Sequence, residues 1–446
     1  MKSTQYLESS RLLASRHAGS HRWWLDIARV GTPCIEPLPD GRWKATFFWK
    51  DPQGSELTSA YRCVWININC LTDHHQSASP QSLQRLSGTD VWFWQTTLNA
   101  GWRGSYSFIP SLEDHPFTPS TEDAHSAMHN VRNWWRGMFG QATHDLLNHR
   151  RAWQGAKGHF LSGVSMPDAP AQPAWQDFDN YATASGRCMP APPAWLQQHR
   201  WTSQRLGNTR NVWVYTTGHS DVTHRPLAIL LDGQFWSQQM PIWDPLMQLT
   251  SQQKLPAAVY LLIDVIDSQQ RAKELTCNED FWLAIQEELL PQLAQWAPHS
   301  SDPAKTVVAG QSFGGLSSLY AGLHWPQRFG CVLSQSGSFW WPRRDLLQAS
   351  QQPQDGCWLL QQIAQGLGNT YPLKIFMQAG VHERLIDHVN ERLVDMLQHS
   401  AHQVNYQKVE GGHDALCWRG GLLDGLQALW APQFTSSIKR VCRQQE

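Results

Sequence analysis

The pentapeptide GQSFG at residues 310–314 carries the strongest chemical signal in this chain. It follows the apolar run 307–309 and precedes a helix-compatible stretch. That strand–turn–helix context is typical of a nucleophile elbow, in which a sharp turn exposes a serine hydroxyl. We expect glycine to be required at both 310 and 314, because a Cβ at either position would crowd the turn. The pattern predicts that Ser312 is a catalytic nucleophile.

A serine hydroxyl becomes nucleophilic when a histidine accepts its proton and an acid orients that histidine. In the α/β-hydrolase order, the acid and then the histidine follow the serine. His413 lies on a glycine-rich loop between the strand-like segment 404–409 and the last predicted helix, so it is the candidate base. Glu383 is the first carboxylate after the strand-like segment 373–377, and Asp387 is its rival.

Two alternatives for the acid stay open. Asp414 directly follows His413, but adjacent side chains on an extended loop point apart, which disfavours it. A serine–histidine dyad without a committed acid is also compatible with the sequence.

An oxyanion hole requires two backbone N–H groups directed at the developing negative charge. The first is expected from Phe313, directly after the nucleophile. The second is expected from Gln234, in the turn after the apolar strand 227–231, where Gly233 permits a tight bend. The alternative is that Asp232 and Gly233 form an ordinary turn.

Several polar and aromatic residues are candidates for the wall of a substrate pocket. Arg271 and Glu274 are predicted to lie in a polar loop, 267–275, where they either clamp substrate or are simply solvated. Tryptophans that flank strand ends more often pack than bind ligand, so the remaining candidates are alternatives to simple packing. They flank the expected strand ends and are Trp340, Trp341, Arg343, Arg344, Trp418 and Arg419.

The second half of the chain, residues 201–446, is predicted to be an α/β-hydrolase domain. Near-continuous apolar strands alternate with helical stretches, which indicates a mostly parallel sheet with helices on both faces. Functional sites form at the carboxyl ends of such strands. The expected strands are 212–215, 227–231, 259–263, 306–309, 330–334, 373–377 and 404–409, and the expected helices are 279–296, 314–324, 384–399 and 420–430.

The first part, residues 1–165, is predicted to be an all-β, sandwich-like domain, with no periodicity after 110. Short aromatic strands separated by turn residues favour this architecture. Residues 166–200 are rich in proline and are interpreted as a linker or extended connection. The expected strands are 42–49, 63–68, 91–98 and 104–109.

Composition excludes several classes of function. The chain has 446 residues and a formal net charge of −1, so no basic field favours nucleic acid or a membrane surface. The N-terminal residues lack the apolar core of a signal peptide, and no apolar run approaches a membrane span. Nine scattered cysteines without a C-x-x-C pair argue against a disulfide framework or a zinc site. We therefore expect a cytoplasmic protein of two domains, without cofactor or catalytic metal.

Longer motifs resemble the enterochelin (enterobactin) esterases, a family of cytoplasmic ferric-siderophore hydrolases. The resemblance spans nearly the whole chain. The sequence departs from the family pattern mainly in residues 1–40, 111–150 and 343–372. It is carried by tryptophan-bearing and glycine-rich segments at 48–55, 72–76, 99–106, 309–316, 333–342 and 411–421.

This resemblance implies the triad Ser312, Glu383 and His413, and hydrolysis of the seryl esters of a catecholate trilactone to dihydroxybenzoylserine units. Iron would belong to the substrate. An anionic, aromatic iron tris-catecholate calls for guanidinium groups and aromatic faces. Arg271 and Arg419, with Trp340, Trp341 and Trp418, are expected to supply them.

Two other functions remain compatible with the residues. One is a feruloyl or other carbohydrate-type esterase with a sugar-binding N-terminal module. The other is a siderophore-binding scaffold without catalysis, for which a fluorophosphonate-unreactive Ser312 would be the evidence.

Overall fold

A computed structural model describes residues 8–75, 78–119, 124–180, 195–219, 224–342 and 357–439. Its contacts group into two compact units. The first comprises Met1–Met189 with Glu410–Leu416, and the second Pro190–Val409 with Cys417–Glu446. The short segment that carries His413 therefore packs within the first unit, although it lies far along the chain in the half predicted to be the hydrolase domain.

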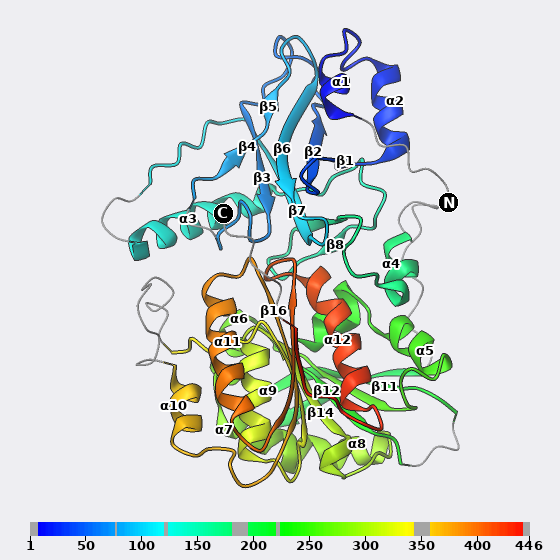
Figure 1. The fold of residues 1–446 in the computed structure, drawn as a ribbon, viewed down its shortest axis with the longest axis vertical. Coiled ribbons are helices and arrows are strands. Elements are labelled where there is room, and N and C mark those ends of the chain that lie inside the picture. Colours follow the sequence, from blue (N-terminus) through cyan, green and yellow to red (C-terminus); the bar gives the residue numbers. More distant parts are fainter. Residues whose placement is uncertain are drawn as a thin grey trace. The chain divides into compact units, whose positions relative to one another are not determined.

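Two antiparallel sheets form the first unit (Figure 1), with strand orders β1-β2-β6-β5 and β4-β3-β7-β9-β8. Strands β2, β3, β6 and β7 coincide with those expected from the aromatic segments. The strands are β1 Cys34–Pro37, β2 Trp43–Lys50, β3 Cys63–Ile68, β4 Gln81–Ser82, β5 Gln84–Arg85, β6 Val91–Leu98, β7 Arg103–Ser111, β8 Trp153–Gln154 and β9 Phe160–Ser165.

The two sheets share one hydrophobic cluster, which contains Phe47 of β2, Ile66 of β3 and Tyr106 of β7. Helices cover the outer faces, so β2 is buried on both sides: Phe48 packs against Trp23 and Trp24 of α2. The helices are α1 Ser9–Leu13, α2 His21–Val30, α3 Ala124–Met138, η1 Phe139–Gln141, η2 Pro173–Trp175 and α4 Gln176–Asn180.

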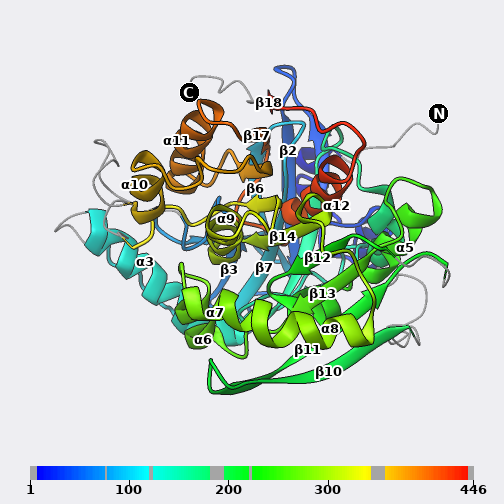
Figure 2. The same cartoon turned by 90° about the horizontal axis from the view of Figure 1, so that it is seen from below.

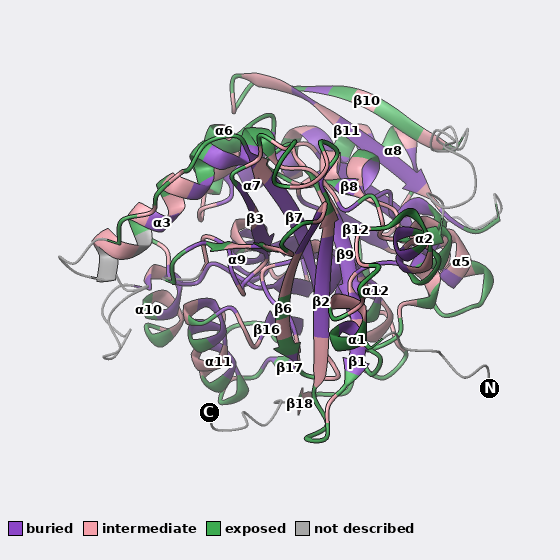
Figure 3. Cartoon of the chain, turned by 90° about the horizontal axis from the view of Figure 1, so that it is seen from above, coloured by how far each residue is buried: buried purple, intermediate pink, exposed green. Residues whose placement is uncertain are grey.

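Helix α3 lies in the polar segment for which the sequence indicated no periodicity. It packs Val131, Trp135 and Met138 against Ile109 of β7. Figure 3 shows buried and exposed residues alternating along this helix. The apolar stripe is formed mainly by aromatic residues and a methionine among many polar ones, which made it easy to miss.

One sheet of nine strands organises the second unit, in the order β10-β11-β13-β12-β14-β15-β16-β17-β18. Strands β10 and β11 are antiparallel to their neighbours, and the remaining pairs are parallel. The strands are β10 Leu196–Ser203, β11 Asn208–Thr216, β12 Leu227–Leu230, β13 Val259–Ile263, β14 Thr306–Gln311, β15 Cys331–Gln335, β16 Lys374–Gly380, β17 Gln403–Val409 and β18 Ser437–Lys439.

Helices cover both faces of this sheet, as predicted for an α/β-hydrolase architecture. Figure 2 shows α9, α10 and α11 on one side of the strands and α5 and α12 on the other. Alternate strand residues such as Val308, Val332 and Ile375 belong to the same hydrophobic cluster as residues of helices α9, α10 and α11. The helices are η3 Phe235–Gln239, α5 Trp243–Ser251, α6 Ser268–Glu274, α7 Glu279–Ala284, η4 Ile285–Leu289, α8 Leu290–Trp296, η5 Pro303–Lys305, α9 Phe313–His324, α10 Trp358–Ala364, α11 Leu385–Gln398 and α12 Ala415–Leu429.

Two local predictions were wrong. The segment predicted as a polar loop at 267–275 is helix α6, whose N-cap Asp267 accepts hydrogen bonds from the N–H groups of Gln269 and Gln270. Residues 196–200, assigned to the linker, begin edge strand β10, which pairs along its whole length with β11. Within the described residues, no helix is both long and apolar enough to span a bilayer.

Candidate active site

Ser312 occupies a strained turn between β14 and α9. Its backbone has φ 60° and ψ −118°, a combination that L-residues rarely adopt. Such strain costs about 1–3 kcal/mol and persists where the surrounding structure enforces it. Here the Ser312 N–H donates to the carbonyl of Gln335, and the Ser312 carbonyl accepts from the N–H of Ser338. The conformation is that of a nucleophile elbow.

Gly310 and Gly314 flank the elbow, but they do not contribute equally. A Cβ on Gly310 would lie 2.5 Å from the backbone carbonyl carbon of Gly314, so glycine is required there. A Cβ on Gly314 would meet its nearest neighbour, a carboxylate oxygen of Asp232, at 3.5 Å, which is ordinary contact. The expectation that both positions need glycine is therefore wrong for Gly314.

A buried row of glutamine side chains supports the strand ends beneath the elbow. Gln311, Gln335 and Gln378 are in register on the parallel strands β14, β15 and β16. Gln311 Nε2 donates to Gln335 Oε1 (3.0 Å), and Gln335 Nε2 donates to Gln378 Oε1 (2.8 Å). These bonds satisfy buried amides that would otherwise be costly, and they link the three strand ends laterally.

Glu383 follows β16 and is 7% exposed. Its Oε1 accepts hydrogen bonds from Ser336 Oγ (2.6 Å) and from the N–H of Gly380 (2.8 Å). Ser336 lies in the segment that follows β15. In the same segment, Ser338 Oγ lies 3.2 Å from Ser312 Oγ. Within the second unit, Ser312 and Glu383 thus contact the same three-residue segment, 336–338.

The two rival carboxylates are engaged elsewhere. Asp387 is fully buried and forms an ion pair with Lys408 at 2.9 Å. Asp414 Oδ2 accepts from the N–H of Ser105 (2.7 Å) and from its Oγ (2.6 Å), and Oδ1 accepts from the N–H of Leu416 (2.8 Å). Burial raises the pKa of Asp414, and the hydrogen bonds from Ser105 and Leu416 oppose that rise. These engagements leave Glu383 as the better candidate acid.

The predicted oxyanion turn lies at the end of β12. Asp232 has φ 55°, and helix η3 begins just beyond Gln234. Phe313 is the first residue of α9, where backbone N–H groups have no intrahelical partner. Both predicted donors, Phe313 and Gln234, are therefore placed at helix starts, where N–H groups are available to an anion.

Arg271 holds this turn in place. From helix α6 its Nε donates to Asp232 Oδ1 (2.6 Å), and one terminal nitrogen donates to Asp232 Oδ2 (2.8 Å). The same nitrogen donates to the carbonyl of Gln311, directly before Ser312 (3.2 Å). Its neighbour Glu274 is 1% exposed and paired with Arg210, so it is neither a solvated loop charge nor a ligand clamp.

The predicted wall residues divide by burial. Trp418 and Trp341 are partly exposed, and Trp418 Nε1 donates to Ser336 Oγ (2.9 Å). Trp340 and Arg419 are 7% and 1% exposed, which argues against direct contact with a large ligand. Arg343 and Arg344 lie outside the described residues.

The loop that carries His413 is held by the first unit through its backbone. The His413 N–H donates to Cys70 Sγ (3.3 Å), and its carbonyl accepts from Asn69 Nδ2 (3.0 Å). A Cβ on Gly412 would lie 2.5 Å from the Cβ of Cys70, so only glycine permits this approach. Further contacts join the loop to Asn99, Arg103, Ser105 and Gln172. Residues scattered through the first unit thus fix the candidate base, which sequence reasoning did not foresee.

Asp73 organises the turn under this loop. The 2% exposed Asp73 accepts hydrogen bonds from the N–H groups of Cys70 and His75 and from His75 Nδ1 (2.7 Å). Burial opposes ionisation of Asp73, but His75 and His74 lower its pKa below the usual range. The His75 ring lies 5.4 Å from that of His413. Cys70, Asp73 and His75 each bring a ligand-type atom within 4.8 Å of the others, and the hydrogen bonds account for that closeness.

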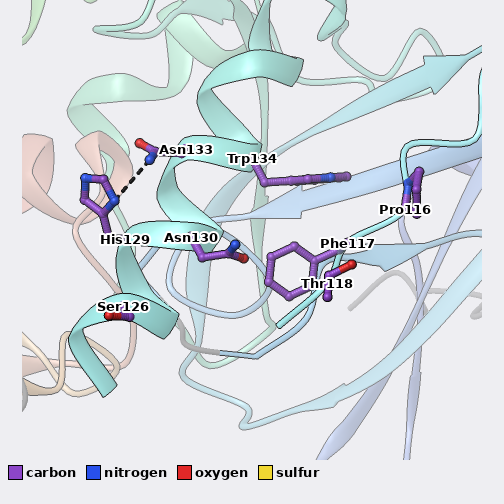
Figure 4. A pocket seen from close by; sticks show the side chains of 8 residues that line it. All are labelled: Pro116, Phe117, Thr118, Ser126, His129, Asn130, Asn133 and Trp134. Carbon is purple, nitrogen blue, oxygen red and sulfur yellow. Dashed lines mark hydrogen bonds between the residues drawn. The ribbon is translucent and has the colours of Figure 1, made fainter. Parts of the chain in front are cut away.

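A separate hollow of about 650 Å³ lies in the first unit (Figure 4). It separates the segment 116–118 from helix α3, and a hydrogen bond joins Asn133 to His129 at its edge (3.0 Å). None of the predicted site residues lines it. Its lining is Pro116, Phe117, Thr118, Ser126, His129, Asn130, Asn133 and Trp134.

Two family models match the chain. One, described as "Enterochelin esterase, N-terminal", matches residues 44–175, and the other, "Putative esterase", matches residues 203–429. The iron(III) enterobactin esterase of Escherichia coli is 49% identical over 416 residues, which are 93% of this chain and 98% of that protein.

Solved structures agree with this match. The ferric enterobactin esterase of Salmonella typhimurium superimposes with a TM-score of 0.82 at 47% identity, over 93% of this chain and 99% of that one. The Shigella flexneri enterobactin esterase, solved in the presence of enterobactin, gives a TM-score of 0.78 at 47% identity over the same shares of the two chains. The chain therefore belongs to the enterochelin esterase family.

Proposed function

We propose that this chain is an iron(III) enterobactin esterase that hydrolyses the seryl esters of the ferric catecholate trilactone in the cytoplasm. The relatives named above supply the substrate and the reaction class. The observation in the molecule itself that carries the proposal is the strained backbone of Ser312, which presents a hydroxyl at the carboxyl edge of a parallel sheet.

The proposed triad is Ser312, His413 and Glu383. Ser312 Oγ attacks the ester carbonyl while His413 accepts its proton, and Glu383 orients the imidazole and stabilises its charge. The N–H groups of Phe313 and Gln234 bind the oxyanion. Collapse releases the serine hydroxyl of the next unit, which takes the proton from His413. Water then hydrolyses the acyl-enzyme, and repetition yields dihydroxybenzoylserine.

For substrate binding we propose Trp341 and Trp418 as aromatic walls, and we propose that Arg271 acts by holding the oxyanion turn through Asp232. Trp340 and Arg419 are both buried, so we assign them packing roles and not ligand contacts. The test is to follow the products of ferric enterobactin by chromatography. Stepwise appearance of linear trimer, dimer and monomer supports the proposal, whereas an unchanged trilactone in the presence of folded protein contradicts it.

Arg271→Gln is expected to lower kcat by about 10²-fold with a smaller change in KM. The guanidinium fork holds the oxyanion turn against the end of β14, and small displacements of catalytic groups are costly. Steady-state kinetics on ferric enterobactin measure the effect, with Arg200→Gln on the exposed edge strand β10 as the matched control. A rise in KM alone would instead assign Arg271 to substrate binding.

Asp414→Asn is expected to lower kcat by about 10²-fold. One carboxylate oxygen accepts from both donors of Ser105 and the other from the N–H of Leu416, whereas an amide has a single oxygen and must turn its NH2 group toward one of these donors. The His413 loop then loses a contact that fixes it. Ser105→Ala removes one donor and should cost about tenfold. Circular dichroism and kinetics are recorded together. Wild-type kcat in a folded Asp414→Asn protein would show that this contact does not position the base.

A further inference from the structure

Three side chains of the turn after β3 bring together the ligand types that zinc binds in proteins. Cys70 Sγ, a carboxylate oxygen of Asp73 and a ring nitrogen of His75 each lie within 4.8 Å of the other two. Thiolate sulfur, imidazole nitrogen and carboxylate oxygen are the ligands of protein-bound Zn²⁺. A C-x-x-C pattern does not reveal this group, because only one of its members is a cysteine.

Hydrogen bonds already hold these ligands in place. Asp73 Oδ1 accepts from the N–H groups of Cys70 (3.1 Å) and His75 (2.9 Å), and Asp73 Oδ2 lies 2.7 Å from His75 Nδ1. The proton of the neutral His75 ring can sit on Nε2, which leaves the Nδ1 lone pair for a cation. Because the turn is preorganised, binding an ion requires little further ordering of the chain.

The charge of the group suits a divalent cation. Cys70 and Asp73 are 1% and 2% exposed, and as thiolate and carboxylate they carry two negative charges, which a buried site must neutralise. The N–H of His413 donates to Cys70 Sγ (3.3 Å), and a hydrogen bond to the charged form of a group favours that form. The His75 side chain is 21% exposed, which gives an ion access from solvent.

The sulfur and nitrogen ligands select among the cations, and His413 is the candidate fourth ligand. Mg²⁺ and Ca²⁺ prefer oxygen ligands, whereas Zn²⁺ binds thiolate and imidazole, and more tightly than Fe²⁺ does. The ring centre of His413 lies 5.4 Å from that of His75. Two imidazoles that bind one zinc at tetrahedral angles, with Zn–N bonds of about 2.0 Å, have ring centres about 5 Å apart. A change in the side-chain torsions of His413 would direct a ring nitrogen at the ion.

We propose that Cys70, Asp73 and His75 bind a Zn²⁺ ion, that His413 completes the coordination, and that the ion reversibly inhibits the esterase. On binding, Cys70 releases its thiol proton to solvent, and His413 gives a ring lone pair to the metal. A neutral imidazole has one nitrogen with a lone pair to give, so a metal-bound His413 cannot accept the proton of Ser312. The inhibition rests on the proposed function, whereas the metal site does not.

The binding test uses the full-length protein, with Co²⁺ as a spectroscopic substitute for Zn²⁺. A thiolate ligand gives Co²⁺ a charge-transfer absorption band, which the wild type should show and Cys70→Ser should lose. Cys70→Ser should also weaken Zn²⁺ binding by about 10²-fold or more, as measured by calorimetry. His75→Ala removes a second ligand at a partly exposed position and should weaken binding as well.

The matched control is Cys63→Ser. Cys63 is the first residue of β3, and its thiol donates to the carbonyl of Glu113 (3.5 Å). This variant should bind both metals as the wild type does, which separates loss of a ligand from loss of a buried thiol.

The inhibition test uses a p-nitrophenyl ester, because catechols themselves chelate zinc. Saturating Zn²⁺ should slow the wild type by about 10²-fold, which is within the usual contribution of a general base, and EDTA should restore the rate. In Cys70→Ser, the rates without and with the same concentration of Zn²⁺ should be nearly equal.

The lack of a cobalt charge-transfer band in the wild type, or a band that persists in Cys70→Ser, would overturn the metal site. Zn²⁺ bound through Cys70 without loss of turnover would overturn the inhibition. A protein that binds Zn²⁺ through Cys70 but hydrolyses neither the p-nitrophenyl ester nor ferric enterobactin would overturn the proposed function and leave the metal site standing.

Discussion

Ser312→Ala is expected to abolish hydrolysis of ferric enterobactin, with a fall in kcat on the order of 10⁴-fold or more. The variant removes the attacking oxygen but keeps the Cβ and the backbone contacts to Gln335 and Ser338 that enforce the elbow. Product release is measured by chromatography, and folding by circular dichroism and thermal unfolding, both of which should match the wild type.

Ser338→Ala is the matched control. Its Oγ lies 3.2 Å from that of Ser312, so it removes a neighbouring hydroxyl from the same site without removing the proposed nucleophile. It should retain most of the activity. Substantial turnover by Ser312→Ala, or an equal loss in both variants, would contradict the assignment of Ser312.

His413→Ala is expected to have the second large effect, about 10⁴-fold or more on kcat. Members of a triad act as a unit, so the double variant Ser312→Ala/His413→Ala should be no slower than Ser312→Ala by itself. This non-additivity tests the pairing of the two residues directly, in addition to the importance of each.

The matched control for the base is His388→Ala, an exposed histidine on α11. It should behave as the wild type in the same assay. If the two losses multiplied, kcat of the double variant would fall far below that of either single variant. That result would show that Ser312 and His413 act independently and would contradict the triad proposal.

The elbow and most of the sheet were predictable because their signals are local. Apolar runs such as 259–263 and 306–309 form buried parallel strands, and the strand–turn–helix context marks Ser312 in the sequence itself. The α/β-hydrolase architecture predicted from these runs is confirmed.

Elements without an apolar signature could not be found in this way. Strand β10 buries only Trp201 and Ser203, and it is held by its pairing with β11 at the edge of the sheet. Helix α6 has few apolar residues, and it carries Arg271, which pairs with Asp232. The sequence suggested that Arg271 binds substrate but could not reveal the carboxylate with which it pairs.

The surroundings of His413 depend on contacts between residues that are far apart along the chain. Asn69, Cys70 and Ser105 hold a loop more than three hundred positions away. A single sequence does not record such pairings, since each partner is an ordinary polar residue.

Labelling with a fluorophosphonate tests the central claim most directly, because this probe reacts with activated serine hydroxyls. The wild-type enzyme should be phosphonylated at Ser312, as located by peptide mass spectrometry, and should lose activity in proportion to labelling. His413→Ala should label far more slowly. A folded, fully active enzyme in which Ser312 stays unmodified would contradict the account.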